Sequence, residues 1–296
     1  MDILADDMCR GRWRNLERDA FFPFQQCWSY GAAAETLGAT TRRYLLREGG
    51  RDLAALQILH RRIGMGFTLV NRGPVWLGDV EVEKRRAVID ALRTWLPGLK
   101  VMTPSDVGLS DALVPRGFRQ IMTPSTLAIL ALDDQTRSRM HGKWRNRLAA
   151  AERTAATVTV SHDADRVRWL LERDTLQQRA RGYRSLPRAF TEAWMTGEPR
   201  GLCLFLARDS DADLAAMLFC LHGSAATYHV GWTSEAGRAV SAHHLILWSA
   251  CQHLMRKGVR HVDLGLVDTQ RALGLARFKL GTGARPVPTG GTWLGW

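Results

Sequence analysis

The chain has 296 residues, of which 46% are hydrophobic and 24% are charged, a composition typical of a soluble globular protein with one or two domains. Its longest apolar runs are too short to cross a bilayer, and the acidic start MDILADD lacks the apolar segment of a signal peptide, so we expect a cytoplasmic protein. A formal net charge of +12 predicts polyanionic partners: nucleic acid, phosphorylated substrates or an anionic membrane surface. The alternative is compositional, because a GC-rich genome also produces many arginines and alanines.

The first half of the chain predicts a helix, three strands, a second helix and two more strands. The first helix opens near Gln26 and ends at Gly38. Strands at 42–48 and 52–61 follow it, joined by Gly49-Gly50, which is a tight-hairpin signal. The later elements are a strand at 67–73, a helix at 82–96 and strands at 99–103 and 126–132.

The second half predicts nearly the same order again. It contains a helix at 165–180, two hairpin strands at 202–208 and 213–222, a strand at 226–232, a helix at 243–258 and a strand at 259–265. Even the local sequence returns, because DLAALQILH from Asp52 is echoed by DLAAMLFCLH from Asp213. We therefore predict two similar domains.

An early antiparallel hairpin followed by a strand–helix–strand crossover is the plan of the acyl-CoA-type N-acyltransferases, the GNAT fold. In that fold, a glycine-rich loop after the third strand holds the CoA pyrophosphate. The corresponding stretch SEAGRAVSAHHL, residues 234–245, keeps Gly237 and Arg238, but Val240 and Ser241 stand where the next glycine is expected. The sequence thus predicts an α/β protein with two tandem GNAT-like domains, and it argues against a CoA thioester as the acyl donor.

The five cysteines show no CxxC or Cys/His spacing, which predicts reduced and mostly buried thiols. The nine histidines form no metal-binding pattern, so we expect no metal and no cofactor. The chain also lacks a Gly-x-Ser-x-Gly elbow and a P-loop, which argues against a hydrolase or an NTPase.

Four stretches carry a more specific signal: FQQCWSYG from Phe24, NRGPVW from Asn71, GKWRNRLAAAERTAATVTV from Gly142, and TYHVGWTSEAGR from Thr227, continuing through VDLGLVD to RFKLGTGARPV. Together they resemble the Fem family, the aminoacyl-tRNA-dependent transferases that add amino acids to peptidoglycan precursor peptides. The resemblance implies a first domain at 1–131 plus 286–296 and a second at 132–285. It also implies a compact type without a coiled-coil arm, because residues 133–160 leave no space for one.

The resemblance also implies roles for individual residues. Lys279 occupies the family position whose cation stabilises the negative charge on the reacting carbonyl oxygen, and Phe278 precedes it. The alternative is a solvated lysine at the end of a helical turn. Asp268 lies in a loop expected to open onto the cleft and is the third catalytic candidate, whereas Asp263 is expected to be structural.

Substrate contacts follow from the same comparison. Lys143, Arg145 and Arg147 are candidates for binding tRNA or phosphate, although they also fit an ordinary solvated helix face. The candidates for binding the acceptor substrate are Arg179, Arg181, Tyr183 and Tyr228, and Tyr228 could equally belong to the core. Two departures, at Ala32–Ala34 and at Thr103, argue against the usual peptidoglycan precursor but not against acyl transfer.

We therefore predict an aminoacyltransferase that moves an amino acid from aminoacyl-tRNA to an amino group of a peptidoglycan precursor or another peptide. The expected partners are aminoacyl-tRNA, the amine-bearing peptide and a membrane surface in peripheral contact. Two alternatives are a GNAT-type N-acyltransferase with an acyl thioester donor, on CoA or a carrier protein, and a non-catalytic tRNA- or envelope-binding protein.

Overall fold

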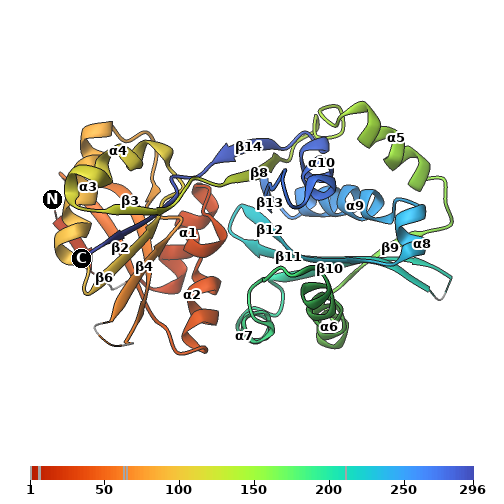
Figure 1. Ribbon diagram of the computed structural model, residues 1–296, viewed down its shortest axis with the longest axis horizontal. Helices are drawn as coiled ribbons and strands as arrows, with labels where there is room; N and C mark the ends of the chain where they lie inside the picture. Colours follow the sequence, from red (N-terminus) through yellow and green to blue (C-terminus); the bar gives the residue numbers. More distant parts are fainter. Residues whose placement is uncertain (1, 6–7, 63, 65, 211) are drawn as a thin grey trace. The chain divides into compact units, whose positions relative to one another are not determined.

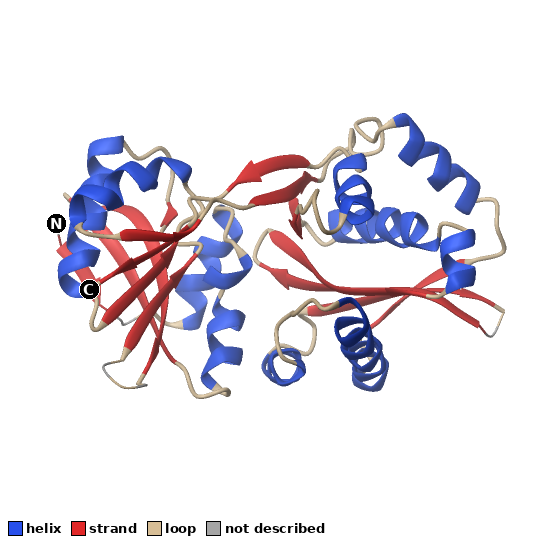
Figure 2. Cartoon of the chain, in the orientation of Figure 1, coloured by secondary structure: helices blue, strands red, loops and turns tan. Residues whose placement is uncertain are grey.

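The computed structural model describes residues 2–5, 8–62, 64, 66–210 and 212–296. It divides into two compact units, one of residues 1–126 and 287–296 and one of residues 127–286. Each unit is a mixed sheet with helices on both faces, which confirms the predicted α/β class (Figure 1; Figure 2). The division falls earlier than the expected boundary after residue 131, because the strand at 126–131 pairs with the second sheet.

In the described part of the chain, the sheet of unit 1 has the strand order β1-β2-β3-β4-β6-β15-β7, with β5 paired to β3. The strands are β1 (Asp2–Ala5), β2 (Thr40–Glu48), β3 (Arg51–Arg61), β4 (Phe67–Asn71), β5 (Val75–Trp76), β6 (Leu99–Thr103), β7 (Arg119–Met122) and β15 (Thr292–Gly295). The helices are α1 (Arg10–Asp19), α2 (Trp28–Glu35), α3 (Val82–Trp95) and α4 (Ser110–Leu113), with short 3₁₀ turns at Phe24–Gln26, Val107–Leu109 and Val114–Arg116.

Alternation along the strands of unit 1 gives the sheet two buried faces. Leu45 packs with Trp13 beneath α1, whereas its neighbour Leu46 faces the opposite core with Ile89 of α3. The predicted hairpin forms between β2 and β3, and both of its glycines, Gly49 and Gly50, have positive φ. The C-terminal strand β15 completes the sheet between β6 and β7.

The sheet of unit 2 has the order β14-β8-β13-β12-β11-β10-β9. Its strands are β8 (Thr126–Ala131), β9 (Thr157–Ser161), β10 (Leu202–Asp209), β11 (Ala212–His222), β12 (Ala225–Thr233), β13 (His261–Leu266) and β14 (Arg285–Pro288). Its helices are α5 (Gly142–Ala151), α6 (Ala164–Arg181), α7 (Arg188–Gly197), α8 (Glu235–Ala239), α9 (Ala242–Arg256) and α10 (Leu273–Gly281). Helices α6 and α7 lie on one face of this sheet, and α5, α9 and α10 lie on the other (Figure 1). The segment at 133–160 therefore holds α5 and the start of β9, not a coiled-coil arm.

The sheet of unit 2 opens between two parallel strands. The pairing of β12 with β13 runs from Ala225 and His261 only as far as Thr227 and Asp263. Just beyond this point, β12 has a bulge at His229 and β13 has an irregularity before Leu266, and such bulges bend and twist strands. In unit 1, by contrast, the corresponding parallel strands β4 and β6 stay paired along their whole length. The carboxyl ends of β12 and β13 therefore leave room for a site, as parallel strands commonly do.

None of the helices in the described part of the chain combines the length and the hydropathy that a transmembrane span requires. Within the same residues, no group of three or more His, Cys, Asp or Glu side chains is arranged to hold a metal ion. All five cysteines are free thiols, and four of them are buried.

Candidate functional site

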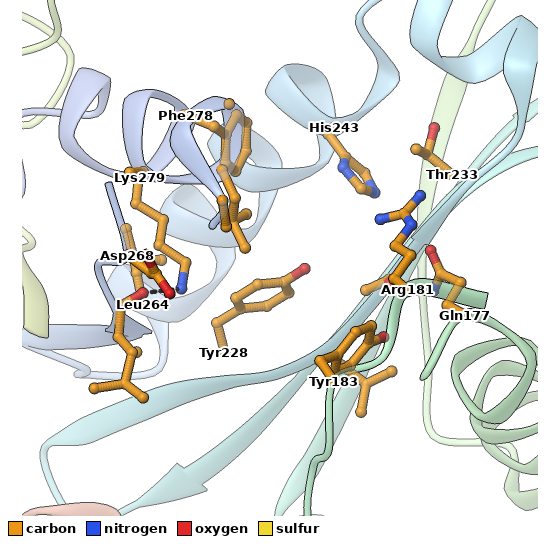
Figure 3. Close-up of a pocket in the computed structure, with 18 of the residues that line it drawn as sticks. Gln177, Arg181, Tyr183, Tyr228, Thr233, His243, Leu264, Asp268, Phe278 and Lys279 are labelled. Carbon is orange, nitrogen blue, oxygen red and sulfur yellow. Dashed lines mark hydrogen bonds between the residues drawn. The ribbon is translucent and has the colours of Figure 1, made fainter. Parts of the chain in front are cut away.

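Unit 2 contains a cavity of about 1210 Å³ at the opening between β12 and β13 (Figure 3). This volume lies slightly above the range of ordinary ligand pockets, about 300–1,000 Å³. One wall comes from β12 and from the end of α6 with its following loop. The opposite wall comes from the end of β13 and from α10, and the start of α9 closes the space between them. The cavity thus forms where the sheet has lost its pairing.

Lys279 lies in this cavity with only 6% of its surface exposed. Its Nζ donates a hydrogen bond of 2.8 Å to the carbonyl oxygen of Leu266, drawn as a dashed line in Figure 3. Burial lowers the pKa of Lys279 to about 8, and the nearby Asp263 carboxylate partly opposes this shift. Asp263 is itself buried and accepts a hydrogen bond from the backbone of Gly265, which matches its expected structural role. The alternative of a solvated Lys279 is therefore wrong.

Phe278 is part of the packing that fixes α10. Its ring lies 5.1 Å from that of His244, 6.0 Å from that of Trp144 and 6.1 Å from that of His243. The Trp144 indole also donates a 3.1 Å hydrogen bond to the Phe278 carbonyl oxygen, and its ring packs against Gly281 so closely that a Cβ there would lie 2.8 Å away. These contacts join α10 to α5 and α9 and so hold Lys279 in place.

Tyr228 follows Thr227, the last residue of β12 that pairs with β13, and it lines the cavity. Its hydroxyl lies over Gly231, where an added Cβ would come within 1.9 Å of the oxygen, so only glycine leaves room for it. Burial raises the pKa of Tyr228 well above its usual range, and the Asp174 carboxylate raises it further. The side chain is therefore a neutral phenol that can donate a hydrogen bond into the cavity (Figure 3).

Asp174 of α6 is a buried cavity residue that the sequence did not single out. It accepts hydrogen bonds from the Tyr183 hydroxyl at 2.6 Å, from Gln178 at 2.7 Å and from the Ser185 hydroxyl at 3.2 Å. The carboxylate thereby fixes the loop after α6. Burial raises the pKa of Tyr183, and the hydrogen bond to Asp174 raises it further. An available signal was its spacing, because Asp174 lies four residues after Leu170 on the buried stripe of α6.

Three histidines also line the cavity, and sequence patterns did not reveal them. His243 donates from Nε2 to the Trp232 carbonyl oxygen at 2.9 Å, which leaves Nδ1 as an acceptor. Burial lowers its pKa. Burial also lowers the pKa of His229 and of His244 to about 4. All three rings are therefore neutral at pH 7, and His243 can accept a proton at Nδ1.

The charged lining of the cavity is mostly cationic. Its acidic members in the described chain are Asp174, which accepts the hydrogen bonds given above, and Asp268. The Oδ1 atom of Asp268 accepts hydrogen bonds from the amides of Gln270 and Arg271. These amides lower the pKa of Asp268, so this carboxylate stabilises its loop and is a weak base. Five arginines line the cavity, all exposed and none of them in an ion pair with a described acidic residue: Arg147, Arg181, Arg184, Arg238 and Arg271.

The structure brings together only some of the expected site residues. Those that line the cavity are Lys279, Phe278, Asp268, Arg181, Tyr183, Tyr228 and Arg147. Arg179, Lys143 and Arg145 lie outside its lining. Residues two apart on a helix point in different directions, which separates Arg179 from Arg181 and Arg145 from Arg147. Arg145 instead donates to the Ser138 carbonyl oxygen, and Lys143 lies one turn earlier along α5.

Comparison with known families supports the fold of this unit. The family described as an acetyltransferase (GNAT) domain matches residues 137–285, which is just over half of the chain. The chain belongs to the GNAT acetyltransferase family. Its second unit is thus an acyltransferase domain, and the sheet opening described above lies within it.

Solved structures extend the likeness of this GNAT protein to the whole chain. A structure of FemX superposes with a TM-score of 0.79 at 14% identity and covers 99% of this chain and 97% of that one. A domain of a putative lysylphosphatidylglycerol synthetase from Agrobacterium fabrum gives 0.56 at 14% identity, over 96% and 90% of the two chains. A tandem GNAT protein from the clavulanic acid pathway gives 0.54 at 13% identity, over 99% and 98%. The predicted Fem-like tandem GNAT fold is confirmed. The sequence matches none of the curated proteins.

Proposed function

We propose that this GNAT protein is an aminoacyltransferase that moves an amino acid from aminoacyl-tRNA to an amino group of a peptidoglycan precursor or another peptide. The observation that carries the proposal is Lys279, an almost fully buried lysine held by a carbonyl oxygen inside an arginine-lined cavity. Burying an ammonium group is unfavourable. Such a lysine is better explained by a role in the cavity than by stability.

In the proposed reaction, the acceptor amine attacks the ester carbonyl carbon of the donor, a C–N bond forms and the ester C–O bond breaks. Negative charge develops on the carbonyl oxygen, and Lys279 Nζ stabilises it from a preorganised position. His243 Nδ1 accepts the proton that the amine loses, because this ring is neutral and its tautomer is set by Trp232. The Tyr228 phenol lies between Lys279 and His243 in Figure 3 and donates a hydrogen bond to the departing oxygen. This oxygen takes up the proton from His243 and leaves as the hydroxyl group of the tRNA.

A polyanionic donor fits the five cavity arginines, since arginine binds phosphate in a bidentate manner. The loop after β12 argues against CoA as that donor. Its glycine, Gly237, packs against the sheet, where an added Cβ would lie 2.1 Å from the Leu214 carbonyl oxygen. The amide N–H of Gly237 also donates a 3.0 Å hydrogen bond to Ser234 Oγ, so this donor is not free to bind a pyrophosphate. Ser241, at φ 57°, stands where a second glycine is expected.

A second candidate function is N-acyl transfer from a thioester, on CoA or a carrier protein. The specific observation in its favour is the acetyltransferase family match over residues 137–285. It would use the same Lys279 and the same amine chemistry. Under either function, we propose a cytoplasmic protein in peripheral contact with a membrane surface, given its net charge of +12.

The test supplies labelled aminoacyl-tRNA or acyl-CoA together with peptides that carry a free amine, and it measures transfer. We expect transfer from aminoacyl-tRNA and a loss of about 10²–10³-fold in rate for Lys279→Ala, as for the removal of one oxyanion donor. Lys257→Ala is the matched control, because Lys257 is exposed, lies outside the cavity and is not a candidate for tRNA binding. Transfer from acyl-CoA alone would select the second candidate. A lack of turnover with every donor would point to a binding protein.

A further inference from the structure

In the described part of the chain, each sheet ends in two edge strands, and β9 is the least protected of the four. Natural edge strands are commonly shielded by charged side chains, proline or bulges, which discourage pairing with another chain. Strand β14 contains Pro286 and Pro288, β7 begins with Arg119 and β1 begins with Asp2. Strand β9 has the sequence TVTVS, without a charge or a proline, and its five residues pair with β10 in one unbroken register.

The outer edge of β9 is open to solvent. On its inner side the strand pairs with β10, and it is the last strand in the order of this sheet. Thr157 and Thr159 are exposed, and Val160 is 38% exposed, whereas Val158 packs against the core of unit 2. The backbone of an edge strand carries unpaired N–H and C=O groups on its outer side, and β-branched residues favour strand pairing. Strand β9 is therefore suited to pair with one more strand.

The sequence of β9 is complementary to itself in one antiparallel register. When Thr159 lies opposite the same residue of a second copy, each Val158 lies opposite Val160 of the other copy. Each Thr157 then lies opposite Ser161. Pairs of β-branched side chains and of hydroxyl side chains each contribute about 0.2–1 kcal/mol to a sheet. A shift of one residue would place valine opposite threonine instead.

The charges that flank β9 also complement each other in this arrangement. Arg153 lies four residues before the strand and Asp163 lies two residues after it, and both are exposed. Antiparallel pairing brings Arg153 of one copy to the end of the strand where Asp163 of the other copy lies. Opposite charges at the rim of an interface fix its orientation more than its affinity. Both the strand and its flanks therefore match a second copy of this chain.

We propose that two copies of this protein associate through β9, antiparallel about a two-fold axis at Thr159, so that their unit 2 sheets become one continuous sheet. A two-fold contact uses both free edges, so the assembly closes as a dimer and does not grow into a fibre. Two five-residue strands form a small interface, and small interfaces bind weakly, so we expect a dissociation constant of roughly 1–100 µM. The inference does not depend on the proposed function, because β9 lies outside the lining of the cavity.

Sedimentation equilibrium of the full chain from about 1 to 300 µM tests the proposal. We expect the average mass to rise with concentration from that of one chain towards twice that value. Thr159→Lys and Thr159→Glu should each weaken the dimer by at least about 10-fold, because like charges then lie directly opposite each other. An equal mixture of these two variants should associate again, since opposite charges then face each other. Ile121→Lys is the matched control, because Ile121 is 54% exposed on the edge strand β7.

A cysteine at the same position measures the register directly. Opposite residues of an antiparallel pair have Cα atoms about 4.5–5.5 Å apart, a distance that a disulfide can bridge. We expect Thr159→Cys to form a disulfide-linked dimer on oxidation, whereas Ile121→Cys should not. Both variants carry Cys9→Ser, because Cys9 is the exposed cysteine of the chain and the other four are buried.

A wild-type protein that stays monomeric over this whole range would overturn the proposal. Association that both charge variants leave unchanged would also overturn it, because the contact would then lie on another surface. A mixture that fails to associate would contradict the two-fold register. If circular dichroism shows that the charge variants are misfolded, the cysteine variant decides, and the absence of a cross-link contradicts the proposal. None of these measurements uses acyl transfer, so they fail or succeed independently of the proposed function.

Discussion

Replacing Lys279 with methionine should make the protein more stable while it loses activity. Methionine has a similar shape and no charge. The pKa of Lys279 falls from 10.5 to about 8 because folding buries the ammonium, and this difference corresponds to about 3 kcal/mol of unfavourable free energy at pH 7. The lost hydrogen bond to Leu266 offsets about 1 kcal/mol of the gain. We therefore expect a net stabilisation of about 2 kcal/mol, or roughly 4–8 °C in Tm.

The pH dependence of this gain separates desolvation from other causes. Below pH 8 the lysine is charged in both states, so wild type carries the full penalty. Between pH 8 and 10.5 the folded state releases its proton while the unfolded state keeps it, so wild type gains stability as pH rises and the advantage of methionine disappears. Urea unfolding of both proteins from pH 6.5 to 10.5 measures this, with Lys143→Met as the exposed control. A variant less stable than wild type at pH 7, or an advantage independent of pH, would refute the reasoning.

Two further predictions follow from the cavity. Arg181→Ala should weaken tRNA binding and reduce the slope of log Kd against log salt concentration by about 0.7–0.9, the effect of one phosphate contact. Arg179→Ala should leave both the affinity and the slope unchanged, because Arg179 lies outside the lining. Filter binding from about 50 to 200 mM salt would show whether the two variants differ. The protein should also lose stability as pH falls from 6.5 towards 4, by about 1–2 kcal/mol at pH 5 for each of His229 and His244. The pKa of these rings is about 4 in the folded state and 6.5 in the unfolded state, so the unfolded state takes up protons first as the pH falls. Urea unfolding at pH 7 and 5 measures this loss, and an equal loss in the double variant His229→Gln, His244→Gln would rule these rings out as its source.

Several elements of the fold could be predicted because their signals are local. Gly49 and Gly50 form a hairpin turn since both adopt positive φ, which glycine tolerates without strain. The helix expected from Gln26 is instead a 3₁₀ turn at Phe24–Gln26 followed by α2 from Trp28, because a single sequence fixes helix ends poorly. The repeated order of helices and strands could be predicted because both domains show the same order of hydrophobic periodicities.

The buried position of Lys279 and its hydrogen bond to Leu266 come from the structure. A lysine near the end of a helix has the same local sequence whether it faces water or a cavity. Its burial depends on α5 and α9, whose Trp144 and His244 pack against Phe278. The resemblance to a family singled the residue out, but only the packing decided its environment.

The amino-acid sequence by itself determined that this chain forms two mixed sheets of similar plan, because periodicity and turn residues act over a few positions. Only the tertiary structure decided that one sheet opens and the other stays closed. The separation of β12 from β13 after Thr227 and Asp263, and the burial of Asp174 beside that gap, depend on contacts between segments far apart in the chain. Such contacts leave no local pattern in the sequence, since each partner is constrained only by the other.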